Sequence, residues 1–161
     1  MSNIQLVSLW DVERQKLIDL MNNDQVRAQL PLLTEHFTQE SCTAFLETKQ
    51  KMWEEHGYGP WAFRINGEFA GWGGLQPECG EADFALVLHP DYWGYGLKIF
   101  KLFERVAFDE LNLSSITALF PPTRNNWRAI TRFGFIKENE LVINNRTFIR
   151  FRLYNDKLKR A

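Results

Sequence analysis

The segment Ala82–Lys98 decides the fold, and it reads A-D-F-A-L-V-L-H-P-D-Y-W-G-Y-G-L-K. Its first part is short and mostly apolar, as in a β-strand, and His89-Pro90 ends that strand. Apolar residues then recur at helical spacing from Gly96 to Leu111, which predicts an amphipathic helix. The turn between strand and helix contains two glycines, and the unpaired N–H groups of a helix start favour an anion. Spacing alone leaves a phosphate site as one open interpretation, because the Walker A pattern and the three-glycine dinucleotide fingerprint are both absent.

The composition of the chain excludes several classes of protein. Its 161 residues are 45% hydrophobic and 24% charged, with a formal net charge of −1. These values predict a single domain over residues 1–161 with a sizeable core, and they exclude a disordered chain. The near-zero charge argues against a nucleic-acid partner. Because no apolar run approaches about 18 residues, we also predict no membrane span.

The cysteines and histidines carry no recognisable pattern. Two cysteines, Cys42 and Cys79, fit a reducing compartment better than a disulfide framework. The N-terminal residues lack a basic segment followed by an apolar block, so a cytoplasmic protein is predicted. The three histidines share no metal-ligand spacing with the cysteines, and we therefore expect no metal site.

Strands and helices are both predicted on either side of the deciding segment. Strands are predicted at about 4–9, 61–65, 68–72, 116–120, 141–143 and 147–153, and helices from an N-cap at Asp11, at about 38–55 and at about 125–133. Asn66-Gly67 and Asn144-Asn145 are typical of two-residue hairpin turns. Gly71, Gly73 and Gly74 predict a bulge or a close backbone approach. This order of elements predicts a mixed α/β or α+β fold.

The deciding segment resembles the GNAT superfamily of acyl-CoA N-acyltransferases, and most closely the branch that contains the ribosomal-protein N-terminal acetyltransferases. The resemblance rests on His-Pro-x-Tyr-Trp-Gly-x-Gly at 89–96 and on a downstream Gly134-Phe135. The predicted order of elements is also that of the superfamily. The resemblance implies a mixed, mostly antiparallel central sheet with a splayed parallel strand pair and flanking helices. This is the acyl-CoA N-acyltransferase fold, in a single N-acetyltransferase domain.

The same resemblance implies acetyl-CoA as the co-substrate. The pantetheine arm is then expected to pair with the backbone of Leu86, Val87 and Leu88. The pyrophosphate is expected on the backbone amides of Trp93, Gly94, Tyr95, Gly96, Leu97 and Lys98. Lys98 stands where the family has glycine or alanine, so its side chain either reaches a phosphate or crowds the turn.

A second block of the superfamily corresponds to residues near the last predicted helix. Thr123 takes the position of an asparagine that usually hydrogen-bonds pantetheine, and Asn126 takes that of the usual serine. Either Asn125 or Asn126 supplies the missing amide, and the spacing does not decide between them.

The candidate for proton removal is Asp83, which stands where the branch commonly has glutamate. An amine with an ordinary pKa near ~10.4 is mostly protonated at neutral pH, so a carboxylate or an ordered water must take its proton. Asp83 is therefore predicted as the base or as the group that orients the amine, with Glu81 as its substitute. A structural role, in which Asp83 caps or pairs within the sheet, is the alternative.

The sequence offers fewer candidates for the oxyanion donor and for the general acid. A backbone N–H of Val87 or Leu88 is the candidate for stabilising the oxyanion. Asn126 joins Asp83 as a candidate catalytic residue by position, although an amide is a poor acid. The tyrosine that many members place four residues before the Gly-Phe pair is Ile130 here, so no general acid is predicted.

Two functions from different classes follow. The first is an acetyl-CoA-dependent N-acetyltransferase that acts on a primary amine, either a protein N-terminus or a small molecule, by direct attack. The second is a non-catalytic CoA-binding or protein-interaction module on a degenerate acyltransferase fold, suggested by Lys98, Thr123 and Ile130. Both a monomer and a homodimer are compatible with the sequence.

Overall fold

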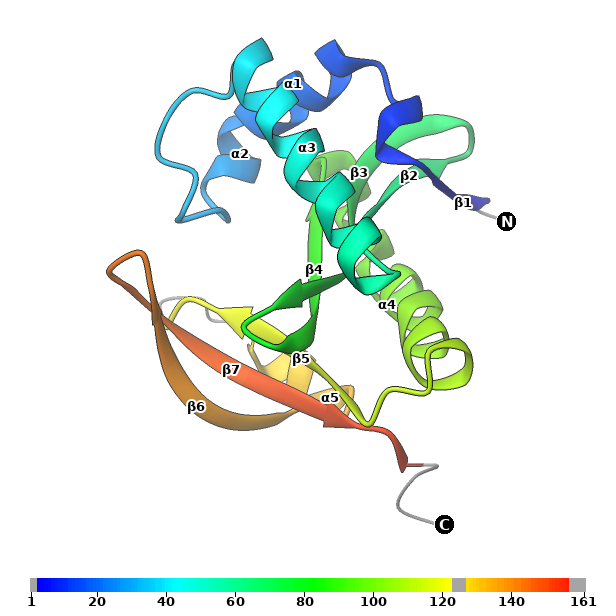
Figure 1. Ribbon diagram of the computed structural model, residues 1–161, viewed down its shortest axis with the longest axis vertical. Coiled ribbons are helices and arrows are strands. Elements are labelled where there is room, and N and C mark those ends of the chain that lie inside the picture. Colours follow the sequence, from blue (N-terminus) through cyan, green and yellow to red (C-terminus); the bar gives the residue numbers. More distant parts are fainter. Residues whose placement is uncertain (1–2, 123–126, 157–161) are drawn as a thin grey trace.

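A seven-stranded mixed sheet forms the centre of the computed structural model, which describes residues 3–122 and 127–156 (Figure 1). The strands are β1 (Ile4–Val7), β2 (Trp61–Ile65), β3 (Glu68–Glu78), β4 (Glu81–Leu88), β5 (Ser115–Phe120), β6 (Ile136–Ile143) and β7 (Arg146–Tyr154). Their order in the sheet is β1-β2-β3-β4-β5-β7-β6. Neighbouring strands are antiparallel except β4 and β5, which are parallel. The predicted fold class is confirmed.

Helices cover both faces of the sheet (Figure 1). They are α1 (Arg14–Asn22), α2 (Asp24–Arg27), α3 (Gln39–His56), α4 (Gly96–Arg105) and α5 (Trp127–Arg132). One core joins α1, α2 and α3 to the sheet through Trp72 and Val87. The other joins α4 to the opposite face through Phe63 and Leu75. Successive residues of a strand point to opposite faces, so β4 contributes side chains to both cores.

Several local predictions are confirmed in detail. Helix α3 is capped by Thr38, whose hydroxyl accepts a hydrogen bond from the Ser41 amide at 3.1 Å. It ends at Gly57, which adopts the left-handed conformation. Strands β2 and β3 are joined at Asn66 and Gly67, and both residues have positive φ, as a type I′ turn requires.

Several element boundaries differ from the predictions, and β6 begins at Ile136, five residues before its predicted start. Asp11 does not cap α1, because it lies in a short 3-10 helix (Leu9–Asp11) capped by Ser8. Strand β3 continues to Glu78, six residues beyond its predicted end, because it pairs with the whole of β4. The α-helical part of the long helix ends at Arg105, and a π-helical turn (Val106–Glu110) follows it.

The predicted close approach is found between β3 and β4. A Cβ atom on Gly71 would lie 2.1 Å from the carbonyl oxygen of Val87, and one on Gly73 would lie 2.3 Å from that of Ala85. Both glycines have φ values, +158° and +151°, that side chains disfavour. Glycine is therefore required at these two positions for β3 to pair closely with β4.

Candidate active site

The candidate site lies where β4 and β5 separate. In the described part of the chain these two strands share one register pair, Asp83 opposite Thr117. Strand β4 pairs with β3 over its whole length, and β5 pairs with β7 over its whole length. From Phe84 to Leu88, β4 therefore has a ladder partner on one side only. The edge that faces β5 opens into a V-shaped gap whose vertex is Asp83.

The pleat decides which backbone groups face this gap. The carbonyl oxygens of Ala85 and Val87 lie against β3, beside Gly73 and Gly71. In an antiparallel ladder the N–H and C=O groups of alternate residues point to opposite edges. Leu86 and Leu88 therefore present their backbone groups to the gap, and the Leu88 carbonyl accepts a hydrogen bond from the Trp93 indole at 2.8 Å. The N–H of Val87 points toward β3, so of the two predicted oxyanion donors Leu88 is the one that faces the gap.

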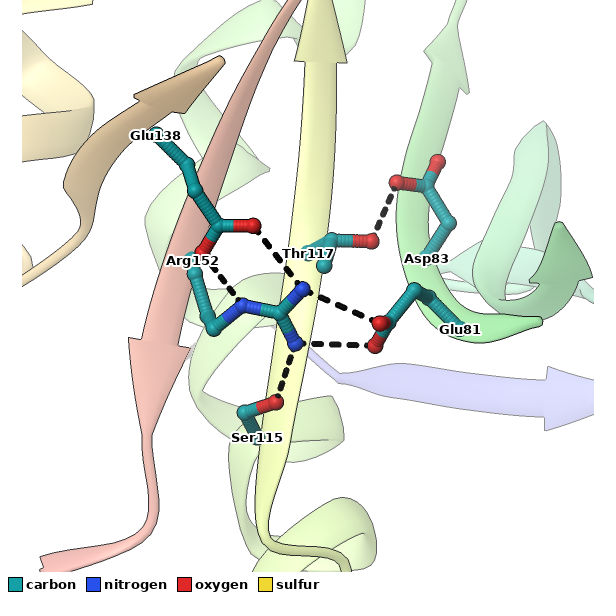
Figure 2. Close-up of polar contacts among 6 residues, drawn as sticks. All are labelled: Glu81, Asp83, Ser115, Thr117, Glu138 and Arg152. Carbon is teal, nitrogen blue, oxygen red and sulfur yellow. Dashed lines mark hydrogen bonds and ion pairs between the residues drawn. The ribbon is translucent and has the colours of Figure 1, made fainter. Parts of the chain in front are cut away.

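Asp83 is a buried carboxyl group at the vertex. Its side chain is 7% exposed, and its Oδ1 accepts a hydrogen bond from the Thr117 hydroxyl at 2.8 Å. Figure 2 shows the second carboxylate oxygen pointing away from Thr117. Burial raises the pKa of Asp83 to about 7, although the Thr117 hydrogen bond and the charge of Arg150 act in the opposite direction. A carboxyl group with a pKa near neutrality can both accept and release a proton at physiological pH.

Glu81, the predicted substitute, is occupied by an ion pair. Its two oxygens accept hydrogen bonds from Arg152 at 2.8 and 3.0 Å. The same guanidinium binds both oxygens of Glu138, at 2.6 and 3.0 Å, and the hydroxyl of Ser115 at 2.7 Å (Figure 2). The hydrogen bonds from Arg152 lower the pKa of Glu81 and of Glu138. Glu81 therefore remains ionised and bound, which suits it poorly to proton transfer.

The turn before α4 is more helical than the sequence predicts. Residues Pro90–Tyr95 form a 3-10 helix that runs directly into α4, and the Gly96 amide donates to the Trp93 carbonyl. The predicted set of open amides from Trp93 to Lys98 is corrected accordingly, because at least the Gly96 N–H is already bonded. Helical φ and ψ values extend back into this turn because His89 caps it, accepting from the Asp91 amide at 3.1 Å.

The residues at the start of α4 nevertheless fit an anionic group. A Cβ atom on Gly94 would meet no protein atom within 4 Å, so open space lies beside the backbone there. Leu97 and Lys98 are exposed in the first turn of the helix. The Lys98 ammonium lies 5.7 Å from the centre of the Tyr95 ring and has no ion pair within residues 3–122 and 127–156. A lysine at the positive end of a helix favours phosphate.

The second predicted block is described only in part. Thr123, Asn125 and Asn126 lie outside the described residues. Ile130 packs against the core on the α4 side, where it offers no acidic proton. Among the described residues no group of three or more histidine, cysteine or acidic side chains is arranged to hold a metal ion. No described helix is both long and apolar enough to cross a membrane.

Sequence reasoning missed the polar residues that surround Asp83. Thr117, Arg150 and Arg152 lie on β5 and β7, and Lys49 lies on α3. The one usable signal was the alternation in β7, where Arg150 and Arg152 interrupt an apolar strand. Charged residues at alternate positions indicate a polar sheet face, but they do not indicate what that face meets.

Comparison with known proteins agrees with this fold. Residues 5–136 match the family described as the acetyltransferase (GNAT) domain. The chain belongs to this family of acetyltransferases, which use acetyl-CoA.

Several solved structures share the fold. An acetyltransferase from Agrobacterium tumefaciens has a TM-score of 0.75 and 17% identity, over 94% of this chain and 90% of that one. A spermidine N-acetyltransferase from Vibrio cholerae, in complex with CoA and spermine, has a TM-score of 0.65 and 20% identity over 97% and 96%. An aminoglycoside acetyltransferase in complex with coenzyme A has a TM-score of 0.70 and 15% identity over 100% and 99%. At these identities the likeness concerns the fold.

Proposed function

We propose that the protein transfers an acetyl group from acetyl-CoA to a primary amine, with Asp83 as the group that takes the proton of the amine. The observation that carries this proposal is a buried carboxyl group, with a pKa raised to about 7, at the vertex of the gap between β4 and β5. Membership of the acetyltransferase family supports the reaction class. The resemblance of Ala82–Lys98 to the ribosomal-protein branch makes a protein N-terminus one acceptor to test, beside small amines.

The proposed cofactor position follows from the open edge of β4. Leu86 and Leu88 present backbone donors and acceptors that a pantetheine amide can bond, as an added strand would. Lys98 and the positive end of α4 then hold the pyrophosphate. The Leu88 carbonyl already accepts from Trp93, so the N–H and the carbonyl of Leu86 are the groups proposed for pantetheine, and the Leu88 N–H remains for the thioester.

The chemical step needs no covalent enzyme intermediate. The nitrogen of the amine attacks the thioester carbon, a C–N bond forms, and the C–S bond breaks with CoA leaving as the thiolate. The proton lost by the amine goes to the Asp83 carboxylate. The N–H of Leu88 stabilises the negative charge that develops on the carbonyl oxygen.

A titration and an assay test the proposal together. Calorimetry with acetyl-CoA is expected to show saturable binding that weakens at least ten-fold in Lys98→Glu. Lys101→Glu is the matched control, because it makes the same charge change one helical turn further along α4 on an exposed residue. Release of the CoA thiol is then measured with a panel of primary amines and N-terminal peptides.

The Asp83→Asn variant tests the role of Asp83, and turnover by the wild type separates the two predicted functions. The amide keeps the shape and the hydrogen-bond acceptor for Thr117 but cannot take a proton, so kcat/KM is expected to fall by about 10²- to 10⁴-fold with CoA binding unchanged. Binding of acetyl-CoA without turnover of any acceptor would favour the non-catalytic module. Equal turnover by Asp83→Asn would overturn the role of Asp83.

A further inference from the structure

The strongest unexplained feature near the site is the side chain of Arg150. It lies on β7 opposite Leu119 of β5, as Arg152 lies opposite Thr117. Directly opposed residues share a face of the sheet, so Arg150 and Arg152 lie on the same face as Asp83 and Thr117. Because β4 and β5 are parallel and separate after Thr117, the position opposite Leu119 lies toward the wide end of the gap.

Arg150 differs from its neighbour in its hydrogen bonding. Its Nε atom is sealed from solvent and has no hydrogen-bond partner, the one such side-chain atom in the part of the chain that the structure describes. The Arg152 guanidinium, by contrast, is held by two carboxylates and a hydroxyl. A buried donor without an acceptor is destabilising unless a bound molecule supplies the acceptor. The Arg150 Nε–H therefore points to a bound group that accepts its hydrogen bond.

The charges around Asp83 indicate the sign of that group. On one flank Arg150 is close enough for its charge to lower the pKa of Asp83. On the other flank the Lys49 ammonium binds the side chain of Gln76, and Gln76 pairs with Asp83 across β3 and β4. The same ammonium lies 5.0 Å from the centre of the Trp72 ring. Glu78 and Glu81 also act on Asp83 and raise its pKa, but neither forms an ion pair with Arg150 within residues 3–122 and 127–156. The Arg150 guanidinium is therefore the cation that is left to attract an anion.

We infer that the acceptor is an amino acid or a similar small amine that carries a carboxylate, and that Arg150 binds this carboxylate while the amine faces Asp83. The inference rests on the proposed function and adds the substrate class. At Asp83 and Thr117, where β4 and β5 still pair, β7 is the second strand from β4 and lies about 10 Å away by the usual strand spacing. An arginine side chain at the next position on this face can therefore reach a small molecule beside Asp83. The planar guanidinium suits a carboxylate, because it offers two parallel N–H donors.

Matched acceptors test the inference. The common α-amino acids and their α-amides are compared in the thiol-release assay, with spermidine as a polycationic acceptor. The wild-type protein is expected to show a KM at least ten-fold lower for its best acid than for the corresponding amide. Arg150→Gln is expected to raise the KM for the acid at least ten-fold and to leave the KM for the amide within two-fold. Arg146→Gln, at the exposed start of the same strand, is the control and is expected to change neither.

A binding measurement separates failure of this inference from failure of the proposed function. The N-acetyl derivatives of the same acids and amides are titrated into the protein saturated with CoA. Preferential binding of an acid, lost in Arg150→Gln, supports the carboxylate site even if no acceptor is turned over. Efficient acetylation of amides or spermidine with no preference for any acid, or acid binding that Arg150→Gln does not change, overturns the inference while leaving acetyl transfer intact.

Discussion

Strand β4 has two neighbours, and the two junctions are built in different ways. Toward β3 the backbones pair continuously, and Gly71 and Gly73 bring them into close contact. Toward β5 there is one register pair, and side chains make the connection: Asp83 with Thr117, and Glu81 with Arg152. The first junction uses the hydrogen-bonding groups of one edge of β4, and the second leaves the other edge open. The polar side chains at the vertex thus keep β4 connected to the rest of the sheet where its backbone leaves β5.

The largest effect is expected from adding a methyl group to the closed junction. Gly71→Ala places a Cβ atom 2.1 Å from the Val87 carbonyl oxygen, so β3 and β4 must separate. We expect the free energy of unfolding to fall by about 4 kcal/mol, measured by urea denaturation. Gly80→Ala is the control, since its φ is also positive but no atom lies within 4 Å, and about 1 kcal/mol is expected. Equal losses in the two variants would mean that the close approach is not what requires glycine.

Removing the arginine from the open junction is expected to have the next largest effect. Arg152→Gln leaves Glu81 and Glu138 without their shared partner, and the arginine side chain is only 13% exposed. We expect a loss of about 2–3 kcal/mol in the free energy of unfolding. A double-mutant cycle with Glu81→Gln should show coupling above about 1 kcal/mol. Lys101→Gln, which breaks an exposed pair with Glu104, is expected to cost less than about 0.5 kcal/mol. Additive losses in the two single variants would show that Arg152 and Glu81 do not stabilise the vertex through their contact.

Asp83→Asn is expected to stabilise the protein above neutral pH. The pKa of Asp83 is raised from 3.8 to about 7, so the folded state binds a proton that the unfolded state releases between these values. Stability from this group is therefore lost as pH rises from about 4 to about 7, and none of it remains above the folded pKa. The variant does not ionise, and we expect it to exceed the wild type by about 1–3 kcal/mol at pH 8 and by little at pH 4. A constant difference across this range would contradict the raised pKa.

The smallest effect is expected at the wide end of the open edge. Trp93→Phe removes the indole N–H that binds the Leu88 carbonyl at 2.8 Å, and the phenyl ring keeps much of the packing. Because Leu88 faces the gap and its carbonyl regains water, the free energy of unfolding should fall by only about 1 kcal/mol. Thermal denaturation measures this change. A loss as large as that of Arg152→Gln would show that Trp93, rather than the vertex, holds the open edge in place.

The glycines of the closed junction could be predicted from the sequence, but the continuation of β3 beyond Trp72 and the contacts of the open junction could not. Turn residues, caps and apolar periods are local signals, so β2 and the boundaries of α3 were predicted to within a residue. The close backbone approach was also predicted from the glycines of β3, and it is found at Gly71 and Gly73. The position of Asp83 came from the family resemblance, but its partner Thr117 is 34 residues away, and Glu81 and Arg152 are 71 residues apart. Contacts of this kind depend on strand order, which periodicity does not encode.

The pH dependence of kcat/KM, measured in the wild type and in Thr117→Val, tests most directly whether Asp83 is the base. The Thr117 hydrogen bond lowers the pKa of Asp83, so its removal must raise that pKa. We predict that activity rises with a midpoint near pH 7 in the wild type and at a higher pH in the variant. Two acceptors with different amine pKa values distinguish Asp83 from the substrate. The midpoint pH should differ between the wild type and Thr117→Val, and it should be the same for both acceptors. A midpoint that moves with the acceptor and is unchanged by Thr117→Val would contradict the role of Asp83 as the base.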